Sequence, residues 1–151
     1  MRPPAGRGDR GMISPESREH IRRRRERPAF GATEFSLDRL RRNMAARREP
    51  EDVTARYIGA DARGAPCEWV VAEGADPDAR LLYLHGGGYA AGSGAFRLGL
   101  AARVSAATRC AVLLADYRLA PEHPFPAGLE DCLRAYEWMR GAGPEGTAPA
   151  K

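Results

Sequence analysis

A histidine and three glycines that directly follow an apolar run are the residues of this chain best suited to chemistry. Residues 81–84 read Leu-Leu-Tyr-Leu, and His85, Gly86, Gly87 and Gly88 come next. Glycine leaves its backbone N–H unshielded and adopts positive φ readily, so such a loop can aim two N–H donors at one point. An oxyanion hole needs this arrangement, because it stabilises the negative charge that builds on a carbonyl oxygen during acyl transfer.

A second distinctive run occupies residues 116–127 and follows another apolar stretch. It reads Asp-Tyr-Arg-Leu-Ala-Pro-Glu-His-Pro-Phe-Pro-Ala, and its three prolines stiffen the backbone. Asp116, Arg118 and Glu122 could form a local ion-pair network within it. We expect this segment to support the glycine loop without doing chemistry itself, and we expect His123 to face solvent or bond to the loop.

Together the two runs resemble the signatures of the hormone-sensitive-lipase-like family (family IV, α/β-hydrolase fold-3) of carboxylic ester hydrolases. The resemblance covers residues 33–141 and matches the front half of that fold. It implies that the complete enzyme acts on a small-molecule ester through a serine nucleophile, a histidine base and an orienting acid, with no cofactor or metal. In such an enzyme Gly87 and Gly88 would donate to the oxyanion and Gly86 would shape the turn. The loop-supporting residues would be His85, Asp116, Arg118 and Glu122.

The chain contains no Gly-x-Ser-x-Gly, the sharp turn that exposes the nucleophile in this fold class. Its five serines are Ser14, Ser17, Ser36, Ser93 and Ser105. Ser93 lies between two glycines, but alanines stand at the positions two residues away, and a helix N-cap is the better interpretation. Cys132 is a conceivable substitute nucleophile, although it falls on an apolar helix stripe. The sequence therefore predicts no nucleophile or base in this chain and leaves open whether the chain is itself an enzyme.

The pattern of apolar residues indicates the elements that must position these loops. Residues 53–58 and 67–71 flank a turn-rich segment and predict an antiparallel hairpin. Residues 80–85 and 110–115 are continuous apolar runs, typical of strands covered on both faces. Between them, the spacing of Phe96, Leu100 and Val104 places these residues on one helical face.

A further helix is expected to open at Pro126. Its apolar stripe would consist of Leu129, Cys132, Leu133, Tyr136 and Met139. The alternation of strands and helices predicts an α/β fold. With the resemblance, we expect an incomplete α/β-hydrolase fold in which an N-terminal hairpin precedes parallel strands with flanking helices.

The N-terminal third differs in character from the rest. Residues 1–12 are rich in Pro, Gly and Arg and are predicted to be a disordered tail. Ser14-Pro15 predicts a helix start, Pro28 should end that helix, and Ser36 could cap a second helix that runs to about residue 48. We therefore expect a basic helical segment over residues 13–50, cap-like by the resemblance, then the front half of the hydrolase core over 51–141 and a flexible tail over 142–151.

Charge and cysteine content limit the classes of function. Residues 1–48 carry 14 arginines against 6 acidic residues, whereas residues 49–151 have a net charge of −4. The arginine-rich stretch has no interleaved aromatic residues to stack on bases, so we expect no nucleic-acid partner. No apolar run is long enough to span a membrane, and no signal peptide is evident. Three widely spaced cysteines fit no metal pattern, which favours reduced thiols and a cytoplasmic location.

Three hypotheses follow for the chain as a whole. In the first, it is the N-terminal part of an esterase and contributes the oxyanion loop. In the second, it is a non-catalytic remnant or a partner piece that completes another chain. A basic nucleic-acid-binding module is the third and weakest. By the resemblance, the strand over 81–84 lacks one neighbour here, so we expect an exposed apolar edge strand that favours aggregation or pairing with another chain.

Overall fold

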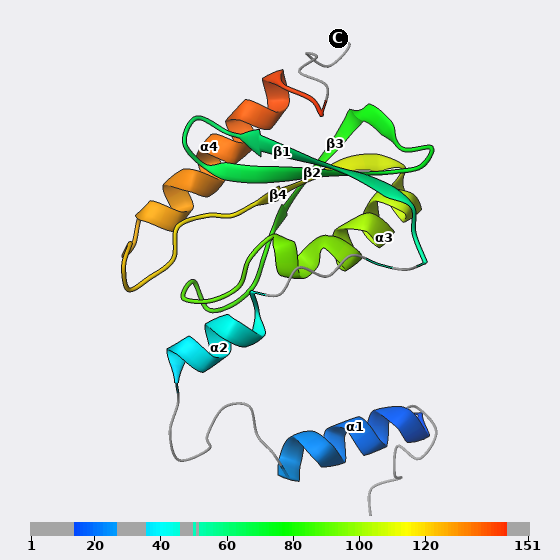
Figure 1. The fold of residues 1–151 in the computed structure, drawn as a ribbon, viewed down its shortest axis with the longest axis vertical. Helices are drawn as coiled ribbons and strands as arrows, with labels where there is room; N and C mark the ends of the chain where they lie inside the picture. The colour runs from blue at the N-terminus through cyan, green and yellow to red at the C-terminus, as the bar shows by residue number, and fades with distance from the viewer. Residues whose placement is uncertain (1–13, 27–35, 46–49, 51, 145–151) are drawn as a thin grey trace, which may run out of the picture. The chain divides into compact units, whose positions relative to one another are not determined.

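The computed structural model describes residues 14–26, 36–45, 50 and 52–144 (Figure 1). Its contacts divide the chain into two units, Met1–Ser36 and Leu37–Lys151. The tail predicted over residues 1–12 and residues 145–151 of the expected C-terminal tail lie outside the described residues. Gly143 and Pro144, at the start of the C-terminal tail, are buried. The helix predicted to run from Ser36 to about residue 48 ends earlier, at Asn43, and a turn follows at residues 44 and 45.

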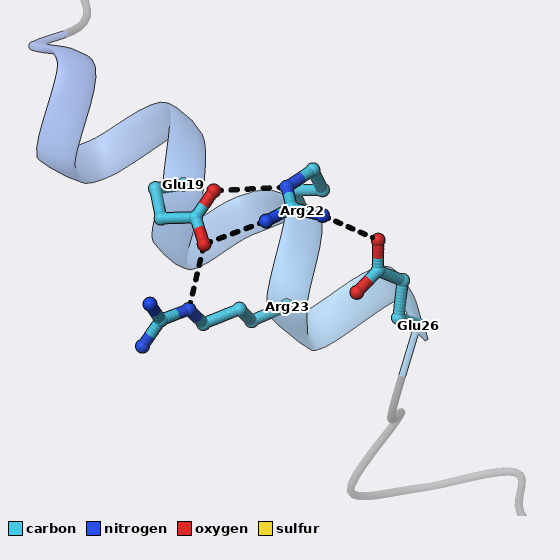
Figure 2. Close-up of a pocket in the computed structure, with 4 residues that line it drawn as sticks. All are labelled: Glu19, Arg22, Arg23 and Glu26. Carbon is cyan, nitrogen blue, oxygen red and sulfur yellow. Dashed lines mark hydrogen bonds and ion pairs between the residues drawn. The ribbon is translucent and has the colours of Figure 1, made fainter.

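The first unit contains helix α1, Pro15–Glu26. The Ser14 hydroxyl accepts a hydrogen bond from the Ser17 amide at 3.2 Å, as expected of an N-cap. Arg22 pairs with both Glu19 and Glu26, and Arg23 also pairs with Glu19 (Figure 2). Two of the arginines that gave this segment its basic character are thus engaged by carboxylates of the same helix.

The second unit is built on a four-stranded mixed sheet of order β1-β2-β4-β3. Strands β1 (Ala55–Asp61) and β2 (Pro66–Ala72) form the predicted antiparallel hairpin. The turn between them is closed by the Gly64 amide, which donates to the Asp61 carboxylate at 2.6 Å. Strand β4 (Cys110–Ala115) pairs antiparallel with β2 and parallel with β3 (Asp76–Leu84). The expected fold class, a hairpin followed by parallel strands, is confirmed.

Helices cover both faces of this sheet (Figure 1). Helix α3 (Leu98–Thr108), preceded by the short 3-10 helix η1 (Ala95–Arg97), packs on the face that carries Val70 and Val112. Helix α4 (Ala127–Gly141) packs on the other face, against Trp69 and Leu113. Because adjacent strand residues point to opposite faces, each central strand contributes side chains to two separate cores. A short helix, α2 (Leu37–Asn43), precedes the sheet in this unit.

The faces that α3 and α4 bury differ from the sequence pattern. Of the expected residues, Val104 packs against the core under α3, whereas Leu100 is 44% exposed. The fully buried residues of the helix are Leu98, Ala101, Ala102 and Ser105. Small side chains face the sheet there because they allow the helix to approach it closely. No helix of the described residues is long and apolar enough to cross a membrane.

In α4 the predicted apolar stripe largely faces outward. Leu129, Leu133 and Tyr136 are each about half exposed, whereas Asp131, Ala135 and Met139 are buried. The helix is rotated so that Asp131 reaches Arg118 and the small Ala135 meets the sheet. The expectation of a fully apolar inner face was therefore wrong at three of its five positions.

Strand β3 occupies one edge of the sheet, as expected for the 81–84 run. Its side chains are only half buried, and Leu84 is 46% exposed. The expectation that a continuous apolar run is covered on both faces was wrong for β3 and right for β4, whose residues 111–115 are buried. The difference arises from position, because β4 lies between two strands and β3 has only one neighbour.

We expect these exposed apolar groups to cause self-association of the chain at micromolar concentration. Replacing both Leu129 and Leu133 by Glu should reduce it without lowering the urea midpoint, since neither side chain lies in a core. Leu98→Ala is the contrasting control and should cost about 2–5 kcal/mol, because Leu98 is fully buried. Size-exclusion chromatography with light scattering measures the first effect, and a monodisperse wild-type monomer would contradict it.

Candidate functional site

The glycine loop joins β3 to η1 and turns back on itself through residues in the left-handed region. Gly88 has φ +64°, Gly92 has φ +104° and Gly87 has φ +148°. The carbonyl of Gly87 accepts hydrogen bonds from the amides of Ala90 at 3.3 Å and Ala91 at 3.1 Å, which closes the turn. A Cβ on Gly87 would lie 1.8 Å from the carbonyl oxygen of Ala91, so no side chain fits at this position.

Three consecutive N–H groups of this loop are available to a ligand. Among the described residues, none accepts a hydrogen bond from the amides of Gly86, Gly87 or Gly88. Gly86 and Gly88 are exposed and Gly87 is half buried. In a trans peptide the C=O and the following N–H point in opposite directions. The bonds that hold the Gly87 carbonyl therefore also direct the Gly88 N–H away from the turn.

His85 anchors the start of the loop instead of facing solvent. Its side chain is buried and stacks on the ring of Tyr117, with 4.3 Å between ring centroids. The Tyr117 hydroxyl donates to the His85 carbonyl at 2.5 Å. The ring Nδ1 lies 3.2 Å from the Gly86 carbonyl, and it donates there in the tautomer that carries the proton on Nδ1. Tyr117 was not singled out from the sequence, although it lies within the second run.

Asp116 holds the far end of the same loop. Its Oδ1 accepts a hydrogen bond from the Gly94 amide at 2.5 Å. Gly94 is buried, and a Cβ there would approach Leu114 and Asp116 at 3.3 and 3.4 Å. The two residues that follow β4 thus hold the two ends of the glycine loop, Asp116 through Gly94 and Tyr117 through His85.

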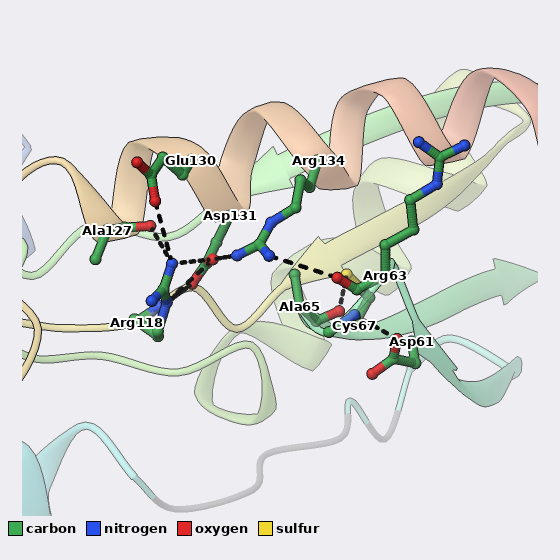
Figure 3. A network of polar contacts seen from close by, with 10 residues as sticks. Asp61, Arg63, Ala65, Cys67, Arg118, Ala127, Glu130, Asp131 and Arg134 are labelled. Carbon is green, nitrogen blue, oxygen red and sulfur yellow. Dashed lines mark hydrogen bonds and ion pairs between the residues drawn. The ribbon is translucent and has the colours of Figure 1, made fainter.

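The ion-pair network expected among Asp116, Arg118 and Glu122 does not exist in the structure. Arg118 donates instead to the buried carboxylate of Asp131 through its side chain and its backbone amide, and its weaker contact with Glu130 is 3.5 Å (Figure 3). Arg134 also binds Asp131. Helix α4 brings Asp131 under the loop, a contact across the fold that the sequence did not indicate.

Asp131 is 1% exposed but remains an anion. Burial raises the pKa of its carboxyl, but hydrogen bonds from Arg118 and Arg134 outweigh burial and hold the pKa below its ordinary value. The carboxylate therefore fixes the 118–127 segment to α4 across the whole neutral range.

Glu122 takes a partner from the N-terminal side of the unit. Both of its carboxylate oxygens bind Arg41 of α2, at 2.6 and 2.7 Å. The hydrogen bond from Arg41 lowers the pKa of Glu122 to about 2. Arg41 was not identified from the sequence, because it is one of several arginines with no local motif. An open depression of about 470 Å³ beside it is lined by Arg41, Ala45, Gly92, Arg118, Leu119, Glu122 and His123.

No catalytic pair is seen among the described serines, cysteines and histidines. The Ser93 hydroxyl accepts from the Phe96 amide in η1, a capping contact of the kind expected, and donates to the Met44 carbonyl. Ser105 is buried and bonds to the Cys110 carbonyl. Burial raises the pKa of the Cys132 thiol, which makes it a poor nucleophile. The described residues also contain no group of three or more His, Cys, Asp or Glu that could hold a metal ion.

Gly92→Ala should destabilise the chain, because the added Cβ would clash within the glycine loop. A Cβ at this position would lie 2.5 Å from the His85 ring and 2.6 Å from the Gly86 carbonyl, and φ is positive. We expect a loss of about 1–3 kcal/mol in the free energy of unfolding. Gly86→Ala is the matched control, because a Cβ there meets nothing within 4 Å, and it should change stability little. Urea unfolding measures both, and equal losses would contradict the proposed packing.

Stability should also depend on the ionised form of Asp131. Because its pKa is lower in the folded chain than in the unfolded chain, the contribution is complete above the ordinary carboxyl pKa and is lost as pH falls through the folded value. Asp131→Asn should cost about 1–3 kcal/mol at pH 7. The difference from wild type should shrink when urea unfolding is repeated below about pH 4. A difference that stays constant with pH would show that the charge is irrelevant.

Comparison with known proteins supports this description. A family model for the alpha/beta hydrolase fold matches residues 81–150. An acetyl-hydrolase from Streptomyces hygroscopicus is 47% identical over 73 residues, which are 48% of this chain and 24% of that protein. Lipase 2 from Moraxella sp. is 44% identical over 62 residues, 41% of this chain and 14% of that lipase.

Solved structures match over a larger part of the chain. The crystal structure of EstE5 soaked with p-nitrophenyl butyrate is 39% identical with a TM-score of 0.75, and the match covers 84% of this chain and 43% of that one. A hormone-sensitive lipase from a metagenome library is 31% identical with a TM-score of 0.68, over 82% of this chain and 42% of that one. The chain thus spans less than half the length of these structures. Over the part that the matches cover, the chain has the α/β-hydrolase fold and is similar to hormone-sensitive-lipase-like carboxylic ester hydrolases.

Proposed function

We propose that this chain contributes the oxyanion hole of a carboxylic ester hydrolase. The observation that carries the proposal is that the N–H groups of half-buried Gly87 and exposed Gly88 bond to no described residue, in a loop that follows β3 and is held at both ends. Two such donors would bind the carbonyl oxygen of an ester and stabilise the negative charge that develops on it during attack.

The remaining chemistry falls to groups outside these 151 residues. A serine nucleophile would attack the ester carbonyl, a histidine would take the serine proton and then deliver it to the leaving alcohol, and an acid would orient that histidine. None of the five serines lies in the required Gly-x-Ser-x-Gly. This scheme uses no cofactor or metal, and its substrate is a small-molecule ester. A cytoplasmic location remains a prediction from the sequence.

In this proposal four residues support the loop without touching substrate. His85 and Asp116 fix its two ends through Tyr117 and Gly94. Arg118 ties the neighbouring 118–127 segment to α4, and Glu122 ties it to α2. Rigid placement matters because a preorganised donor stabilises the transition state without reorganising during the reaction.

A second candidate is a non-catalytic remnant or a piece that completes another chain. The observation that favours it is the exposed apolar surface at the β3 edge and along α4, which would be covered in a complete sheet. A nucleic-acid-binding role has less support, since Glu19 and Glu26 engage Arg22 and Arg23 within α1.

Turnover in a completed enzyme tests the first proposal. Residues 33–141 would be joined to the back half of a related esterase and assayed with p-nitrophenyl butyrate. We expect hydrolysis, and Gly87→Val should lower kcat by about 10²–10³-fold, the usual cost of one oxyanion donor. Gly86→Ala is the control and should retain most of the activity.

The isolated chain, in contrast, should neither turn over the ester nor react with a fluorophosphonate probe. Stoichiometric labelling of any serine would overturn the assignment of the nucleophile to another segment. A folded but inactive fusion would favour the second candidate, and an unaltered kcat in the Val variant would rule out the oxyanion role of Gly87.

A further inference from the structure

The side chain of Arg41 in α2 reaches two separate loops of the core. Its Nε donates to the Ala90 carbonyl at 2.8 Å, and one terminal nitrogen donates to the Ala120 carbonyl at 2.7 Å. The two terminal nitrogens also bind the two carboxylate oxygens of Glu122. The Arg41 side chain is 28% exposed and the Glu122 side chain 54%, so the arginine is the more buried partner of the pair.

The contact with Ala90 acts on the oxyanion loop through rigid peptide planes. The carbonyl of Ala90 and the N–H of Ala91 belong to one trans peptide and point in opposite directions. With the carbonyl held by Arg41, the N–H is directed at the Gly87 carbonyl, which it reaches at 3.1 Å. That carbonyl shares its peptide with the Gly88 N–H. The orientation of the Gly88 N–H is therefore linked to Arg41 through two hydrogen bonds and two peptide planes.

We propose that Arg41 is a positioning residue that fixes the direction of the Gly88 N–H, so that docking of α2 and formation of the oxyanion hole are coupled. This inference rests on the proposed function, which makes Gly88 a donor to the oxyanion. A second link between the same elements supports it, because the Ser93 hydroxyl donates to the Met44 carbonyl just after α2.

The geometry requires arginine and not merely a positive charge. A planar guanidinium offers several donors in fixed directions, whereas a lysine ammonium is a compact group on a flexible stem. Lys at position 41 could keep the ion pair with Glu122 but could not also hold both carbonyls in their present directions. If Arg41 only docked α2 through an exposed ion pair, its loss would have little effect on the loop.

Amide hydrogen exchange by NMR on the full chain separates these roles. The reporter is the Ala91 amide, whose bond to Gly87 should open more often when Arg41 releases Ala90. In Arg41→Lys we expect Ala91 exchange to rise about tenfold relative to the Val112 amide in β4, with a shift of the Gly88 amide resonance. Glu122→Gln removes the charge but leaves the carbonyl contacts of Arg41, so Ala91 should change much less.

Arg103→Gln is the matched control. Arg103 makes a two-point ion pair with Asp52, at 2.8 and 3.1 Å, and within the described part of the chain none of its hydrogen bonds reaches the glycine loop. This variant should leave Ala91 and Gly88 unchanged. The proposal is overturned if Arg41→Lys leaves the ratio of Ala91 to Val112 exchange as in wild type, or if Glu122→Gln raises it as much as Arg41→Lys does.

A measurement on the unaltered chain covers the case in which Arg41→Lys does not fold. The Nε–H proton of Arg41 should exchange with water more slowly than that of Arg140, whose guanidinium lies over the ring of Tyr136. Equal exchange would show that the contact with Ala90 is not maintained and would overturn the proposal. None of these readouts depends on ester turnover, so the inference can fail while the proposed oxyanion role survives. If that role fails in the turnover assay, the exchange measurements still show whether Arg41 positions the Gly88 N–H.

Discussion

The candidate site depends on a backbone approach that only glycine permits. The Ala91 carbonyl oxygen occupies the space where a Cβ of residue 87 would lie, and the Ala91 amide bonds to the carbonyl of the same residue. Because both groups of Gly87 are constrained by one turn, the following N–H is directed outward. A loop with a side chain at position 87 would have to open.

The rest of the unit holds this turn in place from two sides. On the side of the sheet, Asp116 and Tyr117, which directly follow β4, bind the two ends of the loop. From α2, Arg41 binds the carbonyl that precedes Ala91. Hydrogen bonds from these elements thus hold the bent loop at several points.

The buried Asp131 shows how polar contacts outweigh apolar pattern in this fold. Its carboxylate gathers Arg118 and Arg134, and this orients α4 so that three apolar residues of the helix face outward. This orientation of α4 leaves an apolar surface beside the edge strand β3. In the structures to which this chain is similar, more than half of each chain lies beyond the match, which is consistent with such surfaces being covered in longer relatives.

Local patterns in the sequence determined much of the fold. The hairpin, the strand over 110–115, the N-cap at Ser14 and the glycine loop after β3 follow from alternation, turn residues and glycine, whose effects act over a few neighbours. The absence of a nucleophile motif is likewise a property of the sequence alone. Only the tertiary structure decided which helix faces are buried and which carboxylate each arginine binds. Arg41 with Glu122 and Arg118 with Asp131 are paired across the fold, and several arginines and carboxylates satisfy the same local rules, so only three-dimensional proximity selects among them.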